Sequence, residues 1–253
     1  MIGVPVAVEA GSNVLILDTD LGLGNLDVLL GIQPTYTLGD VLLNRCSLQE
    51  ALIVGPKGIK ILSADSGRED FTRLNTGEKM HVFSIFNQLR KEADTILIDT
   101  ASGISSNVLF FSSFAHQVLL IATPEPTSIT DAYATMKVLN RTNGERNFQY
   151  MINLVESRQQ GQEVYETLRA VSERFLKIMP GYAGCILKDK NLTDSVLRQK
   201  PILELHPDSQ ASRDIHFLAE KLLRENRSYL LEEDKEPRSG PYPAGPRDPV
   251  MVQ

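Results

Sequence analysis

Tryptophan is absent from the 253 residues of the chain, and the only two cysteines, Cys46 and Cys185, lie far apart in the sequence. They form neither a CxxC pair nor a spacing typical of metal ligands, so a cysteine-based metal site is not expected. Two isolated cysteines are typical of reduced, buried thiols in a cytoplasmic protein. Because aromatic residues make up only 6% of the chain, composition gives no indication of a surface that stacks against sugars or bases.

Long apolar runs and an excess of positive charge are also lacking. No window approaches about 18 uninterrupted apolar residues, so no transmembrane helix is expected. The first residues do not combine a basic segment with an apolar run, and we expect no signal peptide. The formal net charge of -6 argues against nonspecific nucleic-acid binding, for which clustered Lys and Arg are needed. We therefore expect a cytoplasmic protein with no direct nucleic-acid partner.

Short apolar runs that end in a polar residue or a turn are present at four places. They cover residues 14–17, 95–98, 117–122 and 148–154. Such runs are typical of strands that are buried on both faces of a parallel sheet.

Amphipathic helical patterns lie between and after these runs, at residues 78–92, 128–140, 160–177 and 212–226. For the second of them, Ser128 followed by Asp131 predicts a capping box at the helix start. Strands that alternate with helices predict an α/β fold with a doubly wound, mostly parallel sheet flanked by helices.

The composition changes near Glu232, after which Pro, Gly and charged residues dominate. This composition is typical of a disordered segment. We therefore expect one folded domain over residues 1–231 and a disordered tail over residues 232–253.

Three acidic residues follow the predicted strands. Asp18 and Asp20 come after the first strand, and Asp99 ends the second. In doubly wound sheets, ligands bind at the carboxyl ends of the strands, where such carboxylates can hold a magnesium-bound water or orient an attacking water. An acidic loop that merely ends a strand explains the first pair equally well, and many parallel strands end in Asp.

Longer stretches around these acids carry a family resemblance. Residues 14–30 (VLILDTDLGLGNLDVLL) and 98–105 (IDTASGIS) resemble the switch regions of the ParA/MinD group of deviant P-loop ATPases. Residues 123–133 (TPEPTSITDAY) and 184–189 (GCILKD) are similar to its flagellar site-determining and flagellar-number subgroup. The resemblance covers residues from about 6 to about 225 and implies ATP and magnesium as cofactors.

The resemblance also implies roles for individual residues. It makes Asp20 the catalytic acid that positions the hydrolytic water, and Asp18 and Asp99 the magnesium-site acids, acting mostly through water. It makes Asn25 a nucleotide-binding residue of a mobile loop. Asn153 falls where the family places an adenine-binding Asn, although a cap at the end of a strand is an equal alternative.

One family element has no counterpart. No Lys precedes Lys57, and no Gly-rich loop followed by Lys and Ser or Thr occurs in the chain. We interpret the first eleven residues as the second half of the helix that follows this phosphate-binding loop, ending at Gly11. The fold is then expected to lack its first strand, leaving neighbouring strand edges unpaired. A start downstream of the true one explains this, and a nucleotide-free paralogue is the rival.

The function implied by the resemblance is an ATP-dependent homodimer that engages membrane and partners and is reset by hydrolysis. The partners implied are a flagellar GTPase and a flagellar transcription regulator. A peripheral position on the cytoplasmic side of the inner membrane is an alternative to a purely cytoplasmic one. Residues 212–226 are expected to pack on the sheet, while residues 229–231 are the better membrane candidate, weakened by the acids that follow.

Three other functions remain as alternatives. A nucleotide-free interaction protein keeps the fold without ATPase activity. A DNA-binding partition ATPase is disfavoured by the acidic charge, and a phosphoacceptor receiver domain by the length of the chain.

Overall fold

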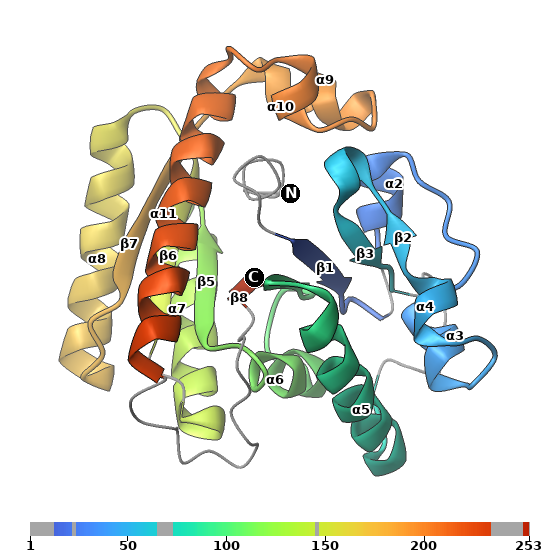
Figure 1. The fold of residues 1–253 in the computed structure, drawn as a ribbon. Coiled ribbons are helices and arrows are strands. Elements are labelled where there is room, and N and C mark those ends of the chain that lie inside the picture. Colours follow the sequence, from blue (N-terminus) through green and yellow to red (C-terminus); the bar gives the residue numbers. More distant parts are fainter. Residues whose placement is uncertain (1–12, 22–23, 65–72, 145–146, 234–249, 253) are drawn as a thin grey trace.

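An eight-stranded sheet with helices on both faces forms the centre of the molecule (Figure 1). The computed structural model describes residues 13–21, 24–64, 73–144, 147–233 and 250–252. The strand order is β2-β3-β1-β4-β8-β5-β6-β7, and every pair is parallel except β2 with β3. The predicted doubly wound, mostly parallel sheet is therefore confirmed.

The predicted apolar runs all form strands. They correspond to β1 (Val14–Asp18), β4 (Thr95–Asp99), β5 (Gln117–Ala122) and β6 (Phe148–Val155). The strands that the sequence did not indicate are β2 (Ile53–Val54), β3 (Lys60–Leu62), β7 (Gly181–Leu187) and β8 (Val250–Val252).

Helices connect most of these strands. Those between β1 and β4 are α2 (Leu26–Leu30), α3 (Leu38–Leu42), α4 (Leu48–Ala51), the 3-10 turn η1 (Pro56–Gly58) and α5 (Thr76–Glu92). Those after β4 are α6 (Ser106–Ser112), α7 (Pro126–Asn143), α8 (Arg158–Leu176), α9 (Lys190–Leu197), α10 (Ile202–Leu205) and α11 (Gln210–Glu233).

Alternate residues of each central strand face opposite sides of the sheet, as the period of two in a strand requires. In β1, Leu15 and Leu17 belong to the large core that includes side chains of α5, α7 and α8. Val14 and Ile16 instead contact the smaller cluster that contains α2. Helices cover both faces of the sheet, so side chains on both sides of a central strand are buried. This explains why these strands are continuous apolar runs.

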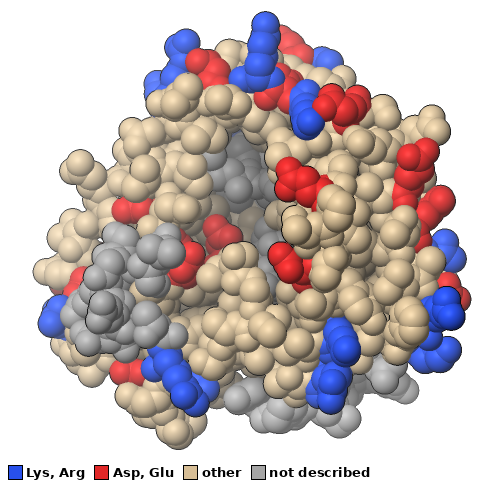
Figure 2. Space-filling model, turned by 180° about the vertical axis from the view of Figure 1, so that it is seen from behind, with Lys and Arg blue, Asp and Glu red and all other residues tan. Residues whose placement is uncertain are grey.

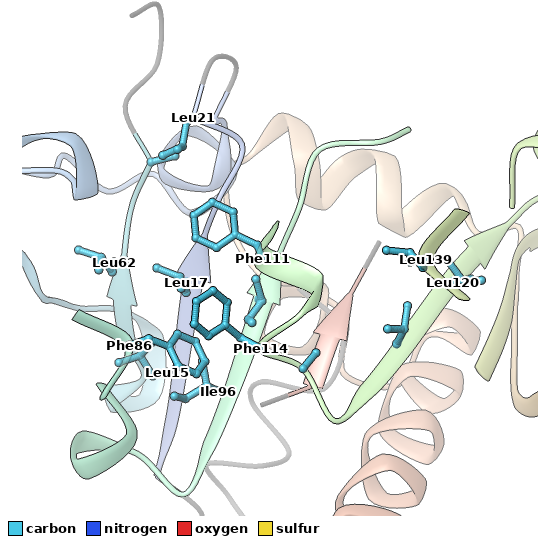
Figure 3. Close-up of a cluster of buried hydrophobic side chains, with 14 of the residues drawn as sticks. Leu15, Leu17, Leu21, Leu62, Phe86, Ile96, Phe111, Phe114, Leu120 and Leu139 are labelled. Carbon is cyan, nitrogen blue, oxygen red and sulfur yellow. The ribbon is translucent and has the colours of Figure 1, made fainter. Parts of the chain in front are cut away.

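Aromatic side chains fill the large core beneath β1 and β4. Phe111 and Phe114 of the α6 region point toward Leu17 and Phe86 in Figure 3. The ring centroids of Phe86 and Phe114 are 4.5 Å apart, and Phe111 is fully buried. This packing fixes the ends of β1 and β4, from which the candidate site is built.

Helix α7 begins earlier than the sequence indicated. The helix starts at Pro126, with Glu125 as its N-cap residue. The Ser128 hydroxyl accepts a hydrogen bond from the backbone N–H of Thr123, 2.9 Å away. The predicted capping box at Ser128 was therefore wrong, because proline favours the first helical position and Ser128 instead stabilises the turn after β5.

Residues 232–253 were expected to be disordered, but the structure describes regular secondary structure at the start and near the end of this segment. Helix α11 continues through Glu233, and Val250–Val252 forms β8 in the middle of the sheet. The neighbouring strands β4 and β5 are thus not left with fully unpaired edges. Residues 234–249 lie outside the described residues, as do residues 1–12, which include the interpreted half-helix and Gly11.

Helix α11 packs on the sheet over its first half, as predicted for residues 212–226. Ile215, Leu218 and Leu222 are buried in a cluster with side chains of β5, β6 and β7. Across the described ranges, no helix is both long and apolar enough to cross a membrane.

Candidate functional site

Two acidic side chains meet at the carboxyl ends of β1 and β4. The parallel register pairs Asp18 directly with Asp99. The next residue, Thr19, ties the strands together, because its backbone N–H and its hydroxyl both donate to the Asp99 carbonyl oxygen, at 2.8 and 2.7 Å. The carboxyl ends of neighbouring parallel strands therefore place two carboxylates side by side.

Burial of Asp18 makes its charge costly. Only 4% of the residue is exposed. Burial, together with the nearby charges of Asp99 and Asp20, raises its pKa to about 7, although hydrogen bonds from backbone N–H groups oppose the shift. One of these bonds comes from Asp20, whose N–H lies 3.0 Å from Asp18 Oδ1. Burial raises the pKa of Asp99 as well, with repulsion from Asp20 acting in the same direction.

The loop after β1 closes tightly over Asp18. A Cβ atom added at Gly24 would lie 3.1 Å from Asp18 Oδ2 and only 2.8 Å from the Cβ of Ala64. Glycine is therefore required for the backbone to approach the carboxylate. The next residue, Asn25, is exposed, and its side chain makes no capping hydrogen bond to α2.

The structure thus brings four of the five predicted site residues to one part of the sheet edge. Asp20 is half-buried two residues after Asp18, and Asn25 is the N-cap residue of the helix that follows. A space-filling view shows acidic side chains around a hollowed centre of one face, with Lys and Arg toward its rim (Figure 2).

Asn153 lies farther along the edge, near the end of β6, with β8 and β5 between it and β4. Its side-chain oxygen accepts a hydrogen bond from the backbone N–H of Leu154, 2.9 Å away. Leu154 has a φ of 57°, in the left-handed region that is unfavourable for leucine. The local bond agrees with the strand-cap alternative, and the contact with adenine stays a prediction.

Three hydroxyl groups at the same edge were missed. Ser63, Thr100 and Thr123 directly follow β3, β4 and β5. Their hydroxyl oxygens are buried and have no hydrogen-bond partner within the part of the chain that the structure describes. Such groups are rare unless they serve a ligand or water. The signal in the sequence was a hydroxyl residue after each strand, but β3 itself was not predicted.

The donor set fits magnesium. Carboxylates and hydroxyls supply hard oxygen donors, and Mg²⁺ usually keeps several waters while binding one or two carboxylates. Among the described residues, no group of three or more His, Cys, Asp or Glu converges to form a protein-only metal cage. Asp18 and Asp99 would therefore hold the ion mainly through its water molecules.

The fold and its acidic edge define the class as the MinD/ParA type of P-loop ATPase fold. The cell division ATPase MinD of Pyrococcus furiosus superimposes with a TM-score of 0.71 at 20% identity, over 86% of this chain and 88% of that one. MinD of Pyrococcus horikoshii, solved as a complex with Mg-ADP, gives a TM-score of 0.70 at 20% identity, over 85% of each chain.

Sequence comparison identifies the family more closely. The antiactivator FleN of Pseudomonas aeruginosa is 37% identical over 239 residues, which cover 94% of this chain and 80% of FleN. The flagellum site-determining protein YlxH of Helicobacter pylori is 29% identical over 90% of this chain and 77% of its own length. No family model matches the chain. The chain belongs to the FleN family within the ParA/MinD group.

Proposed function

We propose that the chain is a MinD-like switch that binds and hydrolyses ATP with magnesium and takes part in setting the number and placement of flagella. The family membership supports the switch, and the name of the flagellum site-determining protein YlxH supports the flagellar role. One solved relative of the same fold holds Mg-ADP.

The observation that carries the proposal is the pairing of Asp18 with Asp99 at the carboxyl edge, beside Asp20 and buried hydroxyl groups. Ligands of doubly wound sheets bind at this edge. Asp18 and Asp99 would hold a divalent ion there, which would supply positive charge to offset that of the phosphates.

Each acid has a distinct part in the proposed reaction. Asp18 and Asp99 would orient the waters of the ion, and because burial raises the pKa of both carboxyl groups, a bound cation would favour their ionised forms. Asp20, which is half-buried rather than enclosed, orients the attacking water. Asn25 sits in the connection between Asp20 and α2, so movement of this loop would couple the state of the nucleotide to the surface.

Further parts of the proposal concern assembly. We propose an ATP-dependent homodimer that contacts a flagellar GTPase and a flagellar transcription regulator. The solved MinC:MinD complex of Aquifex aeolicus shows that one relative of this fold assembles with a partner. Association with the inner-membrane surface through the end of α11 completes the proposal.

Calorimetric titration of magnesium-ATP into the chain tests the nucleotide site. We expect binding that is weakened about tenfold or more by Asp99→Asn, because a group that orients magnesium is lost. Asp20→Ala should retain binding and lose hydrolysis. The exposed Asp131→Asn, on α7, is the matched control and should behave as the unchanged chain. Identical binding by the Asp99→Asn and unchanged chains would rule the site out.

A second candidate is a nucleotide-free interaction protein. Within the described residues, neither Asp18 nor Asp99 has a Lys or Arg side chain among the groups that shift its pKa. Among the described residues, phosphates brought to these acids would thus meet little positive charge from side chains next to Asp18 and Asp99. No heat of binding with either ATP or ADP would favour this candidate.

A further inference from the structure

Two large apolar side chains project into solvent where α8 ends. Phe175 is 63% exposed and Met179 is 65% exposed. Arg174 and Lys177, which are also exposed, lie on the same turn. The Arg174 guanidinium lies 5.1 Å from the centroid of the Phe175 ring, so a cation and an apolar ring are presented together. We call residues 174–179 the α8 turn.

The α8 turn is held to the body of the molecule. Lys177 ends α8 in the left-handed conformation, with a φ of 59°. The next residue, Ile178, is only 4% exposed and belongs to the large core. Beyond the turn, the Tyr165 hydroxyl donates a hydrogen bond to the Pro180 carbonyl oxygen, 3.0 Å away. The exposed side chains are therefore carried by an anchored turn, which loses little conformational entropy when they bind.

The surface around the α8 turn is mainly basic. Helix α7 ends just before β6 and α8 ends just before β7, so both helices end at the amino edge of the parallel sheet (Figure 1). Over the described residues 137–144 and 173–179, the charged side chains are all exposed, and they are Lys137, Arg141, Glu173, Arg174 and Lys177. This end of the molecule therefore favours an anionic partner.

The second half of α11 reaches the same edge. The Lys221 ammonium donates a hydrogen bond to the Tyr182 carbonyl oxygen in the first part of β7. The Gln149 side-chain amide, near the start of β6, donates to the Glu225 carboxylate. Asp18 and Asp99 lie at the opposite, carboxyl edge. An anionic surface could therefore approach the ends of α8 and α11 without meeting these two acids.

The combination of side chains on the α8 turn suits a lipid surface. Aromatic and other large apolar side chains enter the boundary between headgroups and acyl chains, while nearby Lys and Arg attract anionic lipids. An acidic polypeptide would engage the cations, but it would not by itself explain why Phe175 and Met179 project beside them.

We propose that the α8 turn is a membrane contact, in which Phe175 and Met179 enter an anionic lipid surface and Arg174 and Lys177 bind its phosphate groups. The proposal rests on the membrane association included in the proposed function, and it adds a second contact to the one at the end of α11.

The test uses the absence of tryptophan from the chain. Phe175→Trp places a single fluorescent reporter on the α8 turn of the full chain. Val54→Trp is the matched control, because Val54 is 72% exposed and lies on β2, at the other end of the strand order. With magnesium-ATP present, vesicles of phosphatidylcholine and phosphatidylglycerol should shift the emission of Phe175→Trp to shorter wavelength, and brominated lipid should quench it. The emission of Val54→Trp should not change.

The same vesicles are also sedimented with each chain, which separates this proposal from the proposed function. If the chain sediments with vesicles while the emission of Phe175→Trp stays unchanged, the α8 turn is not a contact, and membrane association through α11 stands. If the chain does not sediment at all, both fail. A shift produced by polyglutamate without lipid would also overturn the proposal, because the partner would then be an acidic polypeptide.

Substitutions at the turn give an independent measure of its contribution. Phe175→Ser combined with Met179→Ser should weaken vesicle binding about tenfold or more, because two apolar side chains no longer leave water. Lys177→Asn should weaken it about fivefold, since Asn tolerates the left-handed conformation and only the charge is lost. Val54→Ser and Lys200→Gln, which change exposed residues elsewhere, are the controls. Equal binding by the turn variants and the controls would overturn the proposal.

Discussion

Asp18 and Asp99 are direct register partners at the carboxyl ends of β1 and β4, and burial raises the pKa of both carboxyl groups. The pair stores unfavourable charge at the point where the family resemblance predicts magnesium. Sites of this kind commonly sacrifice stability for function. The resulting loss in the free energy of unfolding should be measurable in the absence of metal and nucleotide.

We predict that Asp18→Asn stabilises the chain at about pH 8 and has little effect at about pH 4. The pKa of Asp18 is about 7 in the folded chain, whereas the ordinary pKa of an aspartate side chain is 3.8. The folded state thus holds its proton more tightly, and stability falls as pH rises between these two values. Removing the charge should restore stability on the order of a few kcal/mol at the higher pH.

Urea denaturation at both pH values, in the presence of a chelator, measures this difference. Asp131→Asn, on the exposed side of α7, is the control. A stabilisation by Asp18→Asn that is the same at both pH values would show that its carboxyl group is not titrating as described.

The buried carboxylate of Asp214 should matter more than exposed ion pairs. Its side chain is 1% exposed, binds Arg158 and Gln210, and accepts a hydrogen bond from the backbone N–H of Leu187 at 3.1 Å. Asp214→Ala leaves that N–H without its partner, which should cost about 1–3 kcal/mol. It also removes the link between the start of α8 and α11.

The ion pair of Glu156 with Lys188 provides the comparison. Both side chains are more than half exposed. Glu156→Ala should change the free energy of unfolding by about 0–1 kcal/mol, as is usual for surface pairs. Equal losses for Glu156→Ala and Asp214→Ala in thermal or urea denaturation would contradict the structural role given to Asp214.

Truncation of Phe111 should destabilise the chain far more than truncation of Phe175. Phe111 is fully buried among other aromatic rings, whereas Phe175, near the end of α8, is 63% exposed. Phe111→Ala leaves a cavity in the large core and should destabilise the chain by about 3–5 kcal/mol. Phe175→Ala should change stability by no more than about 0.5 kcal/mol. A large loss for Phe175→Ala would mean that α8 packs differently from the arrangement described.

The sequence predicted the strands that carry the acids because those strands are continuous apolar runs with an abrupt polar end. Strand β7 was not predicted, since two glycines interrupt its seven residues. Strand β8 was not predictable from local pattern, because its pairing with β4 and β5 depends on contacts distant in sequence and it lies within a stretch dominated by Pro, Gly and charge. The prediction that residues 232–253 are disordered rested on their composition alone.

In the candidate site, too, some features could be predicted from local sequence and others depend on the tertiary structure. Asp18, Asp20 and Asp99 could be placed together because parallel strands end at one edge. Burial, which sets the pKa values, and the three unpartnered hydroxyl groups depend on how the loops close, which local sequence does not determine. The distance along the edge to Asn153 likewise depends on strand order, and β8 adds one strand to it.

The central claim is that nucleotide binds at the carboxyl edge formed by β1 and β4. Hydrogen exchange of the full chain, with and without magnesium-ATP, tests it most directly. We predict slower exchange at Thr19, Asp20 and residues 99–103, with no change at Leu168, which is buried in α8 away from this edge. Unchanged exchange at residues 18–26 and 99–105 under saturating magnesium-ATP would contradict the claim.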